Sequence, residues 1–327
     1  MKVLVTGATG LVGANVCARL VGRGDDVVAL VRDIARAAEL RALGVELALG
    51  DVTDPASVTS ALRDASHVVH AAALLGGATQ DIRLHESVNT YGSRVVLDAA
   101  AAAGVVRSVV LSSHVVFDPA QTITCRSTFP ELMIDTAYAS TKRMALVDAQ
   151  RRVDQGADIV VVVPGGVYGP SPVIARSLER TSVNSRFTEA IVGRVRTWVR
   201  WTVAFVFVDD VTDVIVRSLS GADAGDIHLA MGDPLDVMTL ADASRRLLAM
   251  CGHEADVLEF APEDVPVGQE DEYGGPSLVR LARRGSPVPL FDDAPTRSKL
   301  GVRPTRFEVG ARSTLSWLRG LQLPMES

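Results

Sequence analysis

The sequence predicts an α/β protein with a doubly wound parallel sheet and a smaller second lobe. Two observations predict this fold class. Strand-like and helix-like stretches alternate through the first half of the chain, and the strand-like stretches are continuous valine-rich runs, such as VVALV at 27–31 and DIVVVVP at 158–164. Continuous apolar runs are typical of strands covered by helices on both faces, which is the arrangement of a parallel sheet.

The predicted elements follow one another in a regular order. The first strand covers Val3–Val5, and helical spacing begins in Ala14–Leu20. Further strands are predicted at 27–31, 45–49, 67–73, 108–113, 158–164, 204–210 and 226–232, and helices at 37–44, 57–64, 87–104 and 211–219. We therefore expect residues 1–163 and 203–232 to form the sheet domain. Residues 164–202 and 233–327 are expected to form the smaller lobe, because the late segments are richer in Pro, Gly and acidic residues.

Composition and charge exclude several classes of function. The chain has 327 residues, a net charge of −6 and 47% hydrophobic residues, which argue for a globular protein and against a general nucleic-acid surface. No apolar run approaches the roughly 20 residues of a membrane-spanning helix, and a strand that begins at Lys2 leaves no room for a signal peptide. Cys17, Cys125 and Cys251 form no CxxC pair, so we expect reduced thiols, no cysteine-bound metal and a cytoplasmic protein.

Three glycines, Gly7, Gly10 and Gly13, lie in the turn TGATGLVG between the first strand and the first helix. A glycine-rich turn at the start of a helix lets backbone N–H groups and the helix dipole face a pyrophosphate. The spacing is G-x-x-G-x-x-G rather than G-x-G-x-x-G, so a plain glycine turn is the alternative. With a strand before it and a helix after it, the turn predicts a dinucleotide site.

The end of the second strand indicates which dinucleotide binds. An acidic residue there would bind the adenosine 2′-hydroxyl, whereas an arginine would pair with a 2′-phosphate. The chain reads ALVRD, with Arg32 directly after the strand and Asp33 next, as a helix cap or a ribose contact. The sequence predicts a preference for NADP, with NAD as the alternative. Alternatively, Arg32 is an ordinary exposed arginine that does not contact the cofactor.

The segment YASTK places Tyr138 and Lys142 on one face of a helix. A tyrosine normally ionises near pH 10. An ammonium about 4.5 Å away, at an effective dielectric constant of about 20, would stabilise the phenolate by roughly 3 to 4 kcal/mol, or two to three pKa units. The pair therefore predicts a proton-transferring phenol, and two unrelated surface residues are the alternative. The strand VVLSS ends in two serines, whose hydroxyls could hold a carbonyl oxygen beside the tyrosine.

Taken together, these motifs resemble the extended short-chain dehydrogenase/reductase superfamily, also known as the NAD-dependent epimerase/dehydratase family. The motifs that carry the resemblance are TGATGLVG, GDVTD (50–54), HAAA (70–73), VNTYGS (88–93), SSHVVF (112–117), YASTK (138–142) and PGGVYGP (164–170), followed by SKLGVRPT (298–305). They run in the family's order from residue 2 to about residue 232. The resemblance implies a Rossmann-type sheet, a C-terminal substrate lobe and a nicotinamide cofactor.

The resemblance also implies roles for individual residues. Tyr138 is expected to be the general acid/base, and Lys142 to hold the nicotinamide ribose and to lower the pKa of the tyrosine. Counting back three places from Val116, the catalytic serine is expected to be Ser113, and Asn89 has a supporting role. The residues expected to bind the cofactor are Gly7, Thr9, Gly10, Leu11, Val12, Gly13, Arg32, Asp51, Val52, Ala71, Ala72, Ala73, Tyr138, Lys142, Pro164 and Val167.

Departures from the sugar-nucleotide members of the family suggest the substrate class. ALVRD and SSHVVFDP are closer to dihydroflavonol reductase-like and 3β-hydroxysteroid dehydrogenase-like members. Sugar-nucleotide dehydratases carry Asp-Glu after the catalytic hydroxyl residue, where this chain has His114 and Val115. In RWTVAFVFVDD, Arg200 is displaced from the place where epimerases hold a nucleotide diphosphate, and apolar residues surround it. These departures favour a largely apolar substrate.

The sequence therefore predicts NADP-dependent hydride transfer that reduces a carbonyl, or oxidises the alcohol, of a medium-sized, largely apolar small molecule. One alternative is a nucleotide-sugar epimerase that uses tightly bound NAD(P) without net turnover of the cofactor. Another is a non-catalytic dinucleotide sensor, which would have no need for Ser113, Tyr138 and Lys142. We expect no nucleic-acid or membrane partner. A homodimer through the helices at 87–104 and 138–155 is a further expectation from the family.

Five other side chains have competing interpretations. His114 follows the serine, but the alternation of a strand is expected to point it away from the serine's face. His70 is expected to be a strand-end histidine whose hydrogen bonds are made to the backbone, rather than a catalyst. Trp198, Trp201 and Phe205 are expected to pack the smaller lobe, and lining the substrate pocket is the alternative.

Overall fold

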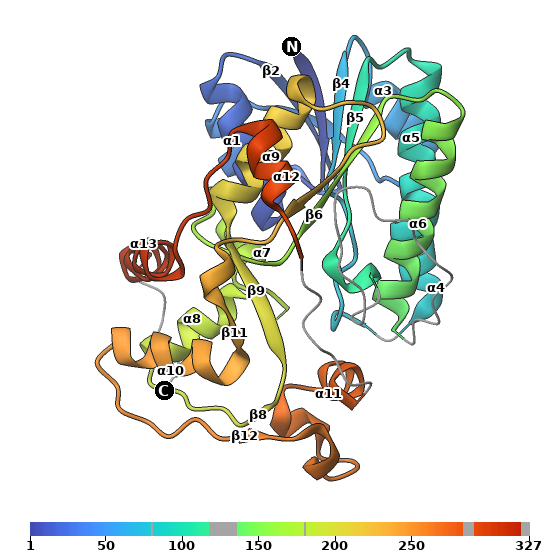
Figure 1. Cartoon of the computed structure of the whole chain (residues 1–327). Helices are drawn as coiled ribbons and strands as arrows, with labels where there is room; N and C mark the ends of the chain where they lie inside the picture. Colours follow the sequence, from blue (N-terminus) through green and yellow to red (C-terminus); the bar gives the residue numbers. More distant parts are fainter. Residues whose placement is uncertain (80, 118–135, 180, 284–290, 322–327) are drawn as a thin grey trace.

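The chain folds into a sheet domain and a smaller lobe, which Figure 1 shows one above the other. The parts of the chain that the computed structural model describes are residues 1–79, 81–117, 136–179, 181–283 and 291–321. Cys125 lies outside them. Within the described ranges, no helix combines the length and the apolar character needed to cross a bilayer.

Seven parallel strands form the main sheet. Their bounds are β1 Lys2–Thr6, β2 Asp26–Val31, β3 Glu46–Leu49, β4 His67–His70, β5 Arg107–Leu111, β6 Ile159–Pro164 and β10 Ile227–Ala230. They lie in the order β10-β6-β5-β4-β1-β2-β3, and each neighbouring pair is parallel. The strand order reverses between β1 and β4, which is where open α/β sheets bind ligands. The predicted doubly wound sheet is confirmed.

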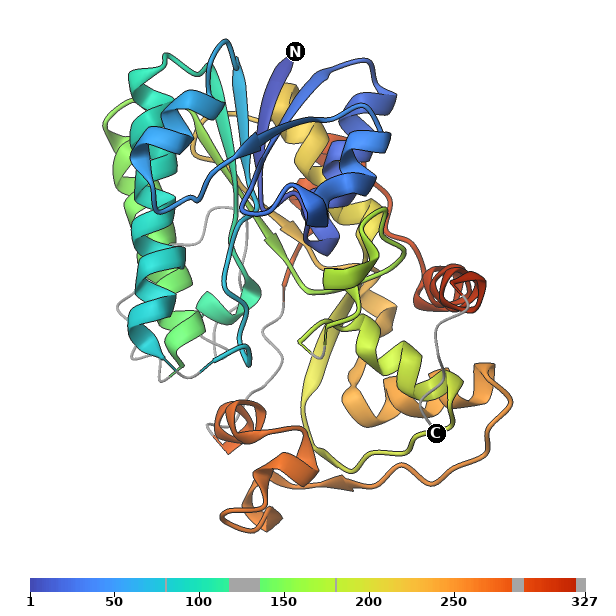
Figure 2. The same ribbon diagram turned by 180° about the vertical axis from the view of Figure 1, so that it is seen from behind.

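Helices cover both faces of this sheet. They are α1 Leu11–Gly22, α2 Ala38–Ala42, α3 Pro55–Ala61, α4 Ile82–His85, α5 Gly92–Ala102, α6 Ala137–Asp154, α9 Val208–Gly221 and α12 Ala294–Leu300. Helices α1, α9 and α12 lie on one face, and α3, α5 and α6 lie on the other, as the two opposite views of Figure 1 and Figure 2 show. A π-helical segment, η2 Glu86–Tyr91, joins α4 to α5.

The strands are valine-rich because both of their faces are covered. In β1, Val3 and Val5 belong to one apolar cluster, whereas Leu4 between them belongs to a second cluster on the opposite face. All three side chains are fully buried. This confirms the sequence argument from continuous apolar runs.

The smaller lobe contains two short sheets and several helices. The elements are β7 Gly166–Tyr168, β8 Trp198–Val199, β9 Thr202–Phe207, β11 Val237–Thr239, β12 Glu259–Phe260, α7 Ile174–Ser177, α8 Asn184–Ile191, α10 Leu240–Met250, α11 Pro276–Arg283 and α13 Phe307–Gly320. The strand expected at 204–210 ends at Phe207, and β9 pairs with β7 and β11 rather than with the main sheet. Helix α9 begins at Val208 because Asp209 and Asp210 suit the positive end of a helix dipole.

Aromatic rings form the core of the smaller lobe. Tyr168 stacks on Phe187 with the ring centroids 5.2 Å apart, and it also contacts Phe307 at 5.4 Å. Phe205 packs in the same cluster and is 4% exposed. Trp198 is buried too, and the guanidinium of Arg186 lies 4.4 Å from the centroid of its ring. Trp201 is partly buried and packs against the same cluster. Trp198, Trp201 and Phe205 therefore all pack in the smaller lobe, as one of the two interpretations predicted.

Candidate active site

A cavity of about 280 Å³ opens at the carboxyl ends of β1, β4, β5 and β6, next to β7. It brings together residues that are far apart in the sequence. The predicted site residues that line it are Gly7, Thr9, Gly10, Leu11, Val12, Gly13, Ala71, Ala73, Ser113, Tyr138, Lys142, Pro164 and Val167. Arg32, Asp51, Val52, Ala72 and Asn89 lie outside its lining. The cavity occupies the place that the strand order assigns to a ligand.

The glycine turn at one end of the cavity has room for a ligand but not for side chains. Gly7 has a φ of +69°, and a Cβ built on it would lie 2.5 Å from the backbone N of Ala72. A Cβ on Gly13 would lie 2.3 Å from the carbonyl oxygen of Gly7. Gly10 is the N-cap of α1, and the first turn of this helix contains no acidic residue. Backbone N–H groups and an uncompensated helix dipole therefore face the cavity, which fits the pyrophosphate of a dinucleotide.

Ser113, Tyr138 and Lys142 lie together at the other end of the cavity. Ser113 follows β5, and Tyr138 lies in the first turn of α6, which Thr136 caps by accepting a hydrogen bond from the Ala139 N–H. The side chains of Ser113 and Tyr138 are hydrogen-bonded to each other. Lys142 is 4% exposed, and its Nζ donates to the Leu111 carbonyl oxygen at 2.5 Å.

Burial controls the protonation of this group. It raises the pKa of Tyr138 above its ordinary value of 10, and the hydrogen bond with Ser113 opposes this change. It also lowers the pKa of Lys142 from 10.5 to about 8. The lowering of the Tyr138 pKa expected from Lys142 is not found, because burial of the phenol dominates. The Lys142 ammonium donates to the Leu111 carbonyl.

Asn89 supports the site without lining the cavity. Its side chain is 1% exposed and bonds both backbone groups of Leu74, accepting from N–H at 2.7 Å and donating to C=O at 3.1 Å. Its Nδ2 also donates to Oγ1 of Thr141 at 3.2 Å, in the residue before Lys142. Asn89 thus connects the loop after β4 to α6.

His70 lies at the end of β4 in a buried chain of hydrogen bonds. The Thr6 hydroxyl lies 2.7 Å from its Nδ1, and its Nε2 lies 2.8 Å from the Ser93 hydroxyl, which donates to the Asn89 carbonyl. One tautomer, with the proton on Nε2, satisfies the whole chain. Burial, with a smaller contribution from the charge of Lys142, lowers the pKa of His70 to about 3. His70 is a neutral structural residue as expected, but its ring nitrogens bond the side chains of Thr6 and Ser93 rather than the backbone groups predicted for it.

The strand end expected to hold the adenosine lies beside the cavity. Asp33 caps the next helical turn, since its carboxylate accepts from the N–H of Ala35 at 2.9 Å and pairs with Arg36 at 3.6 Å. Arg32 is exposed, and it makes no hydrogen bond or ion pair with any other residue in the described part of the chain. Of the two alternatives for Asp33, the structure has the helix cap.

Asp51 and Val52 shape the turn after β3. The Asp51 carboxylate accepts from both N–H and Oγ1 of Thr53, at 2.9 and 2.8 Å. Val52 is 8% exposed and packs with the cluster that contains Leu4 and Val28. These contacts hold the turn, and no described contact assigns either residue to a ligand.

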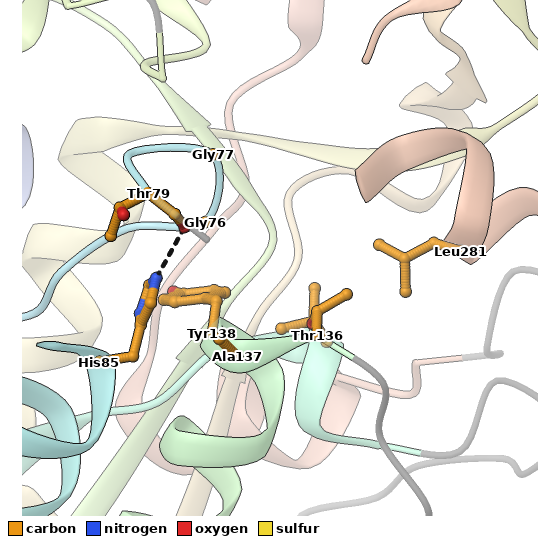
Figure 3. A pocket seen from close by; sticks show the side chains of 9 residues that line it. Gly76, Gly77, Thr79, His85, Thr136, Ala137, Tyr138 and Leu281 are labelled. Carbon is orange, nitrogen blue, oxygen red and sulfur yellow. Dashed lines mark hydrogen bonds between the residues drawn. The ribbon is translucent and has the colours of Figure 1, made fainter. Parts of the chain in front are cut away.

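Ser112, the first of the two serines that end the VVLSS segment, also lines the cavity, and its buried Oγ has no hydrogen-bond partner among the described residues. Sequence reasoning missed several further residues of the site. Arg176 and Glu179 line the cavity from the smaller lobe. A second pocket of about 70 Å³ lies beside Tyr138, with His85 in its wall (Figure 3). The pattern of a single sequence holds no signal for these positions, because they depend on how loops fold back over the strands.

The strand order, the glycine turn and the cluster of Ser113, Tyr138 and Lys142 define a dinucleotide-binding enzyme of the short-chain dehydrogenase/reductase class. The chain belongs to the NAD-dependent epimerase/dehydratase family, whose sequence model matches residues 3–232. Enzymes of this family use nicotinamide cofactors and act on sugar or ketone groups.

The chain is similar to several curated proteins. Sterol demethylase protein B of Methylococcus capsulatus is 28% identical over 98% of both chains. A dTDP-4-dehydro-6-deoxy-D-allose reductase of a Streptomyces species is 28% identical over 91% of this chain and 93% of the relative. The 4-hydroxy-2-methyl-3-oxo-4-farnesyl-3,4-dihydroquinoline-1-oxide ketoreductase of Stigmatella aurantiaca is 26% identical over 72% of this chain and 70% of the relative. Dihydroflavonol reductase-like and 3β-hydroxysteroid dehydrogenase-like proteins are also among the relatives, as the sequence motifs predicted.

The fold is shared with solved structures. The crystal structure of gox2253 superposes with a TM-score of 0.83 and covers 98% of each chain at 22% sequence identity. This similarity confirms the Rossmann-type sheet and its accompanying lobe as a fold.

Proposed function

We propose that the protein is an NADP-dependent oxidoreductase that reduces the carbonyl group of a medium-sized, largely apolar molecule, or oxidises the corresponding alcohol. The observation that carries the proposal is the placement of Ser113, Tyr138 and Lys142 around one cavity with the glycine turn. Sterol demethylase protein B and the farnesyl-dihydroquinoline-oxide ketoreductase among the relatives support an apolar substrate.

The surroundings of Tyr138 also support an apolar substrate. Leu75 lines the main cavity, and Val115 and Leu281 line the smaller pocket on the other side of the phenol. His114 is turned to the Pro164 carbonyl, with Nδ1 at 3.3 Å, and burial lowers its pKa. Neither His114 nor Val115 offers the carboxylic acid that elimination of water from a sugar would need.

The mechanism follows from the atoms at the end of the cavity. When bound, the nicotinamide supplies the hydride for the carbonyl carbon. Tyr138 gives its phenolic proton to the substrate oxygen, and the raised pKa keeps this proton in place at neutral pH. The Ser113 hydroxyl, already bonded to Tyr138, orients the same oxygen. Lys142 is charged below a pH of about 8 and, in the proposed role, holds the nicotinamide ribose.

Arg32 supports the choice of NADP. Its guanidinium is exposed at the end of β2 and has no partner in the described residues, so it is available to pair with a 2′-phosphate. Asp33, which would favour the 2′-hydroxyl of NAD, is occupied as a helix cap. Gly7, Gly10 and Gly13 would hold the pyrophosphate, and Pro164 and Val167 would border the nicotinamide.

A nucleotide-sugar substrate is the second candidate. It is favoured by the dTDP-sugar reductase among the relatives, which matches 91% of this chain. Arg176 in the cavity lining is the cation that such a substrate would meet. In the epimerase form of this candidate, the cofactor would be recycled rather than consumed.

The deciding experiment follows nicotinamide absorbance with the purified protein. NADPH or NADH is supplied with aryl ketones, aldehydes, dihydroflavonols, ketosteroids and UDP-sugars. Stoichiometric consumption of NADPH with an apolar carbonyl is the expected result. Conversion of a UDP-sugar without loss of absorbance would replace the proposal by the epimerase. Binding of NADPH with no turnover of any compound would leave the sensor alternative.

We also propose a homodimer through the face formed by η2 and α6. Tyr91, Met144 and Val147 are exposed on these helices, at 45%, 49% and 48%. Three large apolar side chains that remain exposed on adjacent helices are typical of an interaction surface. Sedimentation at micromolar concentration should give twice the mass of one chain, and a monomer mass would contradict the proposal.

A further inference from the structure

We propose that His85 is a positioning residue for Tyr138, acting through the loop 74–79. This inference rests on the proposed role of Tyr138 as the proton donor. The loop 74–79 leads from β4 to α4 and forms one wall of the 70 Å³ pocket beside the phenol. Figure 3 shows His85 and Tyr138 side by side under this loop.

Both ring nitrogens of His85 are engaged. Nε2 of His85 lies 3.2 Å from the Thr79 carbonyl oxygen, and Figure 3 draws this bond. Nδ1 of His85 lies 3.3 Å from Nδ2 of Asn89. A carbonyl oxygen can only accept, and the Asn89 amide nitrogen can only donate. The proton therefore sits on Nε2, and a single neutral tautomer satisfies both contacts. His85 is 1% exposed, so no water replaces either partner without rearrangement.

Loop 74–79 is fastened at its two ends by two different side chains. Asn89 bonds both backbone groups of Leu74 at one end. His85 bonds the carbonyl of Thr79 at the other end, and no other described residue donates to that oxygen. Gly77, between them, has a φ of +85° and adds no side chain that could stiffen the loop. The loop also has the bond from Ala78 N–H to the Leu75 carbonyl at 3.3 Å and accepts the Asp81 N–H at Oγ1 of Thr79 at 3.1 Å. The contribution of His85 is to tie the carbonyl at the Thr79 end to the side chain that faces Tyr138.

The fastened loop and His85 itself both touch Tyr138. A Cβ built on Gly76 would lie 3.3 Å from Cδ1 of Tyr138, so the loop backbone packs directly on the phenol ring. The His85 ring meets the same phenol edge-on, with centroids 6.3 Å apart and planes at 63°. Release of the loop would remove the Gly76 surface that packs on the phenol ring, and a change of the His85 side chain would alter the second surface.

The Thr79 contact, rather than the Asn89 contact, carries the effect. Asn89 keeps three other hydrogen bonds, two to Leu74 and one to Thr141, if the bond to His85 is lost. The Thr79 carbonyl oxygen accepts no other hydrogen bond from the described residues. This difference predicts that variants of His85 will behave differently according to which nitrogen they imitate.

The test uses three substitutions in the full chain. The amide nitrogen of His85→Gln reaches the place of Nε2 and can still donate to Thr79, whereas His85→Asn can replace only Nδ1. His85→Phe keeps a ring but no hydrogen bond. His253→Phe is the matched control, because Nε2 of His253 also lies near a carbonyl oxygen, that of Ile191 at 3.3 Å, in the smaller lobe.

Two measurements are made on each variant. The first is the ¹⁹F NMR signal of Tyr138 in protein labelled with 3-fluorotyrosine, assigned among the four tyrosines by Tyr138→Phe. It requires no substrate and is therefore independent of the proposed reaction. The second is steady-state reduction of the carbonyl compound found in the absorbance panel, with kcat separated from the KM for NADPH.

We expect His85→Phe and His85→Asn to shift or broaden the Tyr138 signal and to lower kcat roughly 10- to 100-fold, since a small displacement of a reacting group is costly. The KM for NADPH should stay unchanged, and His85→Gln and His253→Phe should resemble the unsubstituted protein in both measurements. If His85→Phe does not fold, the comparison of Gln with Asn decides.

Three results would overturn the inference. The first is an unchanged Tyr138 signal in both His85→Phe and His85→Asn. The second is a His85→Gln variant as impaired as His85→Asn, which would mean that Thr79 is not the relevant partner. The third is an equal loss in His253→Phe, which would indicate a general effect of removing a buried bond. If the panel yields no carbonyl substrate, the proposed reaction is contradicted. The NMR signal of Tyr138 then tests the positioning role of His85 by itself.

Discussion

The sheet domain and the smaller lobe are packed in different ways. The two apolar clusters on the faces of β1 contain mostly valine, alanine and leucine, and no aromatic ring. The core of the smaller lobe is an aromatic cluster of Tyr168, Phe187, Trp198, Phe205, Phe207 and Phe307, contributed by separate segments of the chain. The core around β1 is therefore aliphatic, whereas aromatic rings make up the centre of the smaller lobe.

The two regions contribute different parts of the same cavity. The backbone of the sheet domain sets the positions of the glycine turn, Ser113 and the start of α6, where chemistry needs fixed geometry. The smaller lobe contributes Arg176, Glu179 and 181–183, where the proposed substrate would be accommodated. A mutation in the sheet domain should therefore affect both NADPH binding and the free energy of unfolding, whereas a mutation in the core of the smaller lobe should affect mainly the free energy of unfolding.

The largest effect is expected from Gly7→Ala in the sheet domain. The new Cβ would lie 2.5 Å from the Ala72 N, at a φ of +69° that side chains rarely adopt. We expect the free energy of unfolding to fall by more than about 4 kcal/mol and NADPH binding to be lost. Gly22→Ala is the control, because no atom lies within 4 Å of its Cβ, and it should change stability by less than about 1 kcal/mol. Urea unfolding and fluorescence titration measure both effects.

Phe307→Ala tests the aromatic core of the smaller lobe. The ring is 1% exposed and contacts Tyr168, Phe187 and Phe205. Its loss should cost about 3 to 5 kcal/mol of unfolding free energy, which is the usual cost of deleting a buried aromatic ring. The Kd for NADPH should change less than about 3-fold, because the variant leaves the backbone of the sheet domain intact. A parallel loss of NADPH affinity would show that the two regions cannot be separated in this way.

Acid should weaken the sheet domain through His70. Burial holds the pKa of His70 at about 3, whereas a histidine in the unfolded chain ionises near pH 6.5. Below pH 6.5 this histidine binds a proton in the unfolded chain but stays neutral in the folded protein, which stabilises the unfolded chain. The contribution of neutral His70 to the free energy of unfolding is therefore fully present above pH 6.5 and is lost as the pH falls toward 3. The loss amounts to roughly 3 kcal/mol at pH 4. His70→Gln should reduce the difference in unfolding free energy between pH 7 and pH 4 by that amount, and an unchanged difference would refute the assignment.

The smallest effect is expected at the edge of the sheet domain. Arg32→Ala should weaken NADPH binding about 10-fold, through loss of a charge-assisted contact with the 2′-phosphate, and leave NADH binding unchanged. Arg36→Ala is the matched control, since Arg36 is a neighbouring exposed arginine that already pairs with Asp33. Equal changes for both cofactors would remove the basis for choosing NADP.

The sequence alone could predict the sheet domain because its strands are read from local patterns. The strands at 27–31, 45–49 and 158–164 lie within one residue of their predicted ends. The strand predicted at 67–73 ends earlier, at His70, and Ala71 and Ala73 beyond its end line the cavity. Residues at strand ends of a parallel sheet share one edge, so the grouping of Ser113 with the glycine turn could also be predicted.

The smaller lobe and the loops could not be predicted in the same way. Strand β9 looks like a strand of the main sheet from its valines, yet it pairs with β7 and β11. Nothing in the pattern around His85 indicates that its ring binds a carbonyl six residues earlier. The charge of Lys142 could be placed near Tyr138, but not its bond to Leu111, because the orientation of a buried ammonium depends on the nearest carbonyl.

The central claim is that Tyr138 transfers a proton while the glycine turn binds the cofactor, and Tyr138→Phe tests it most directly. NADPH affinity is measured by fluorescence titration, and turnover by loss of nicotinamide absorbance with the carbonyl compound found in the panel. We predict unchanged affinity with turnover reduced at least about 100-fold, since only the proton donor is removed. Turnover within a few-fold of the unsubstituted protein would contradict the account.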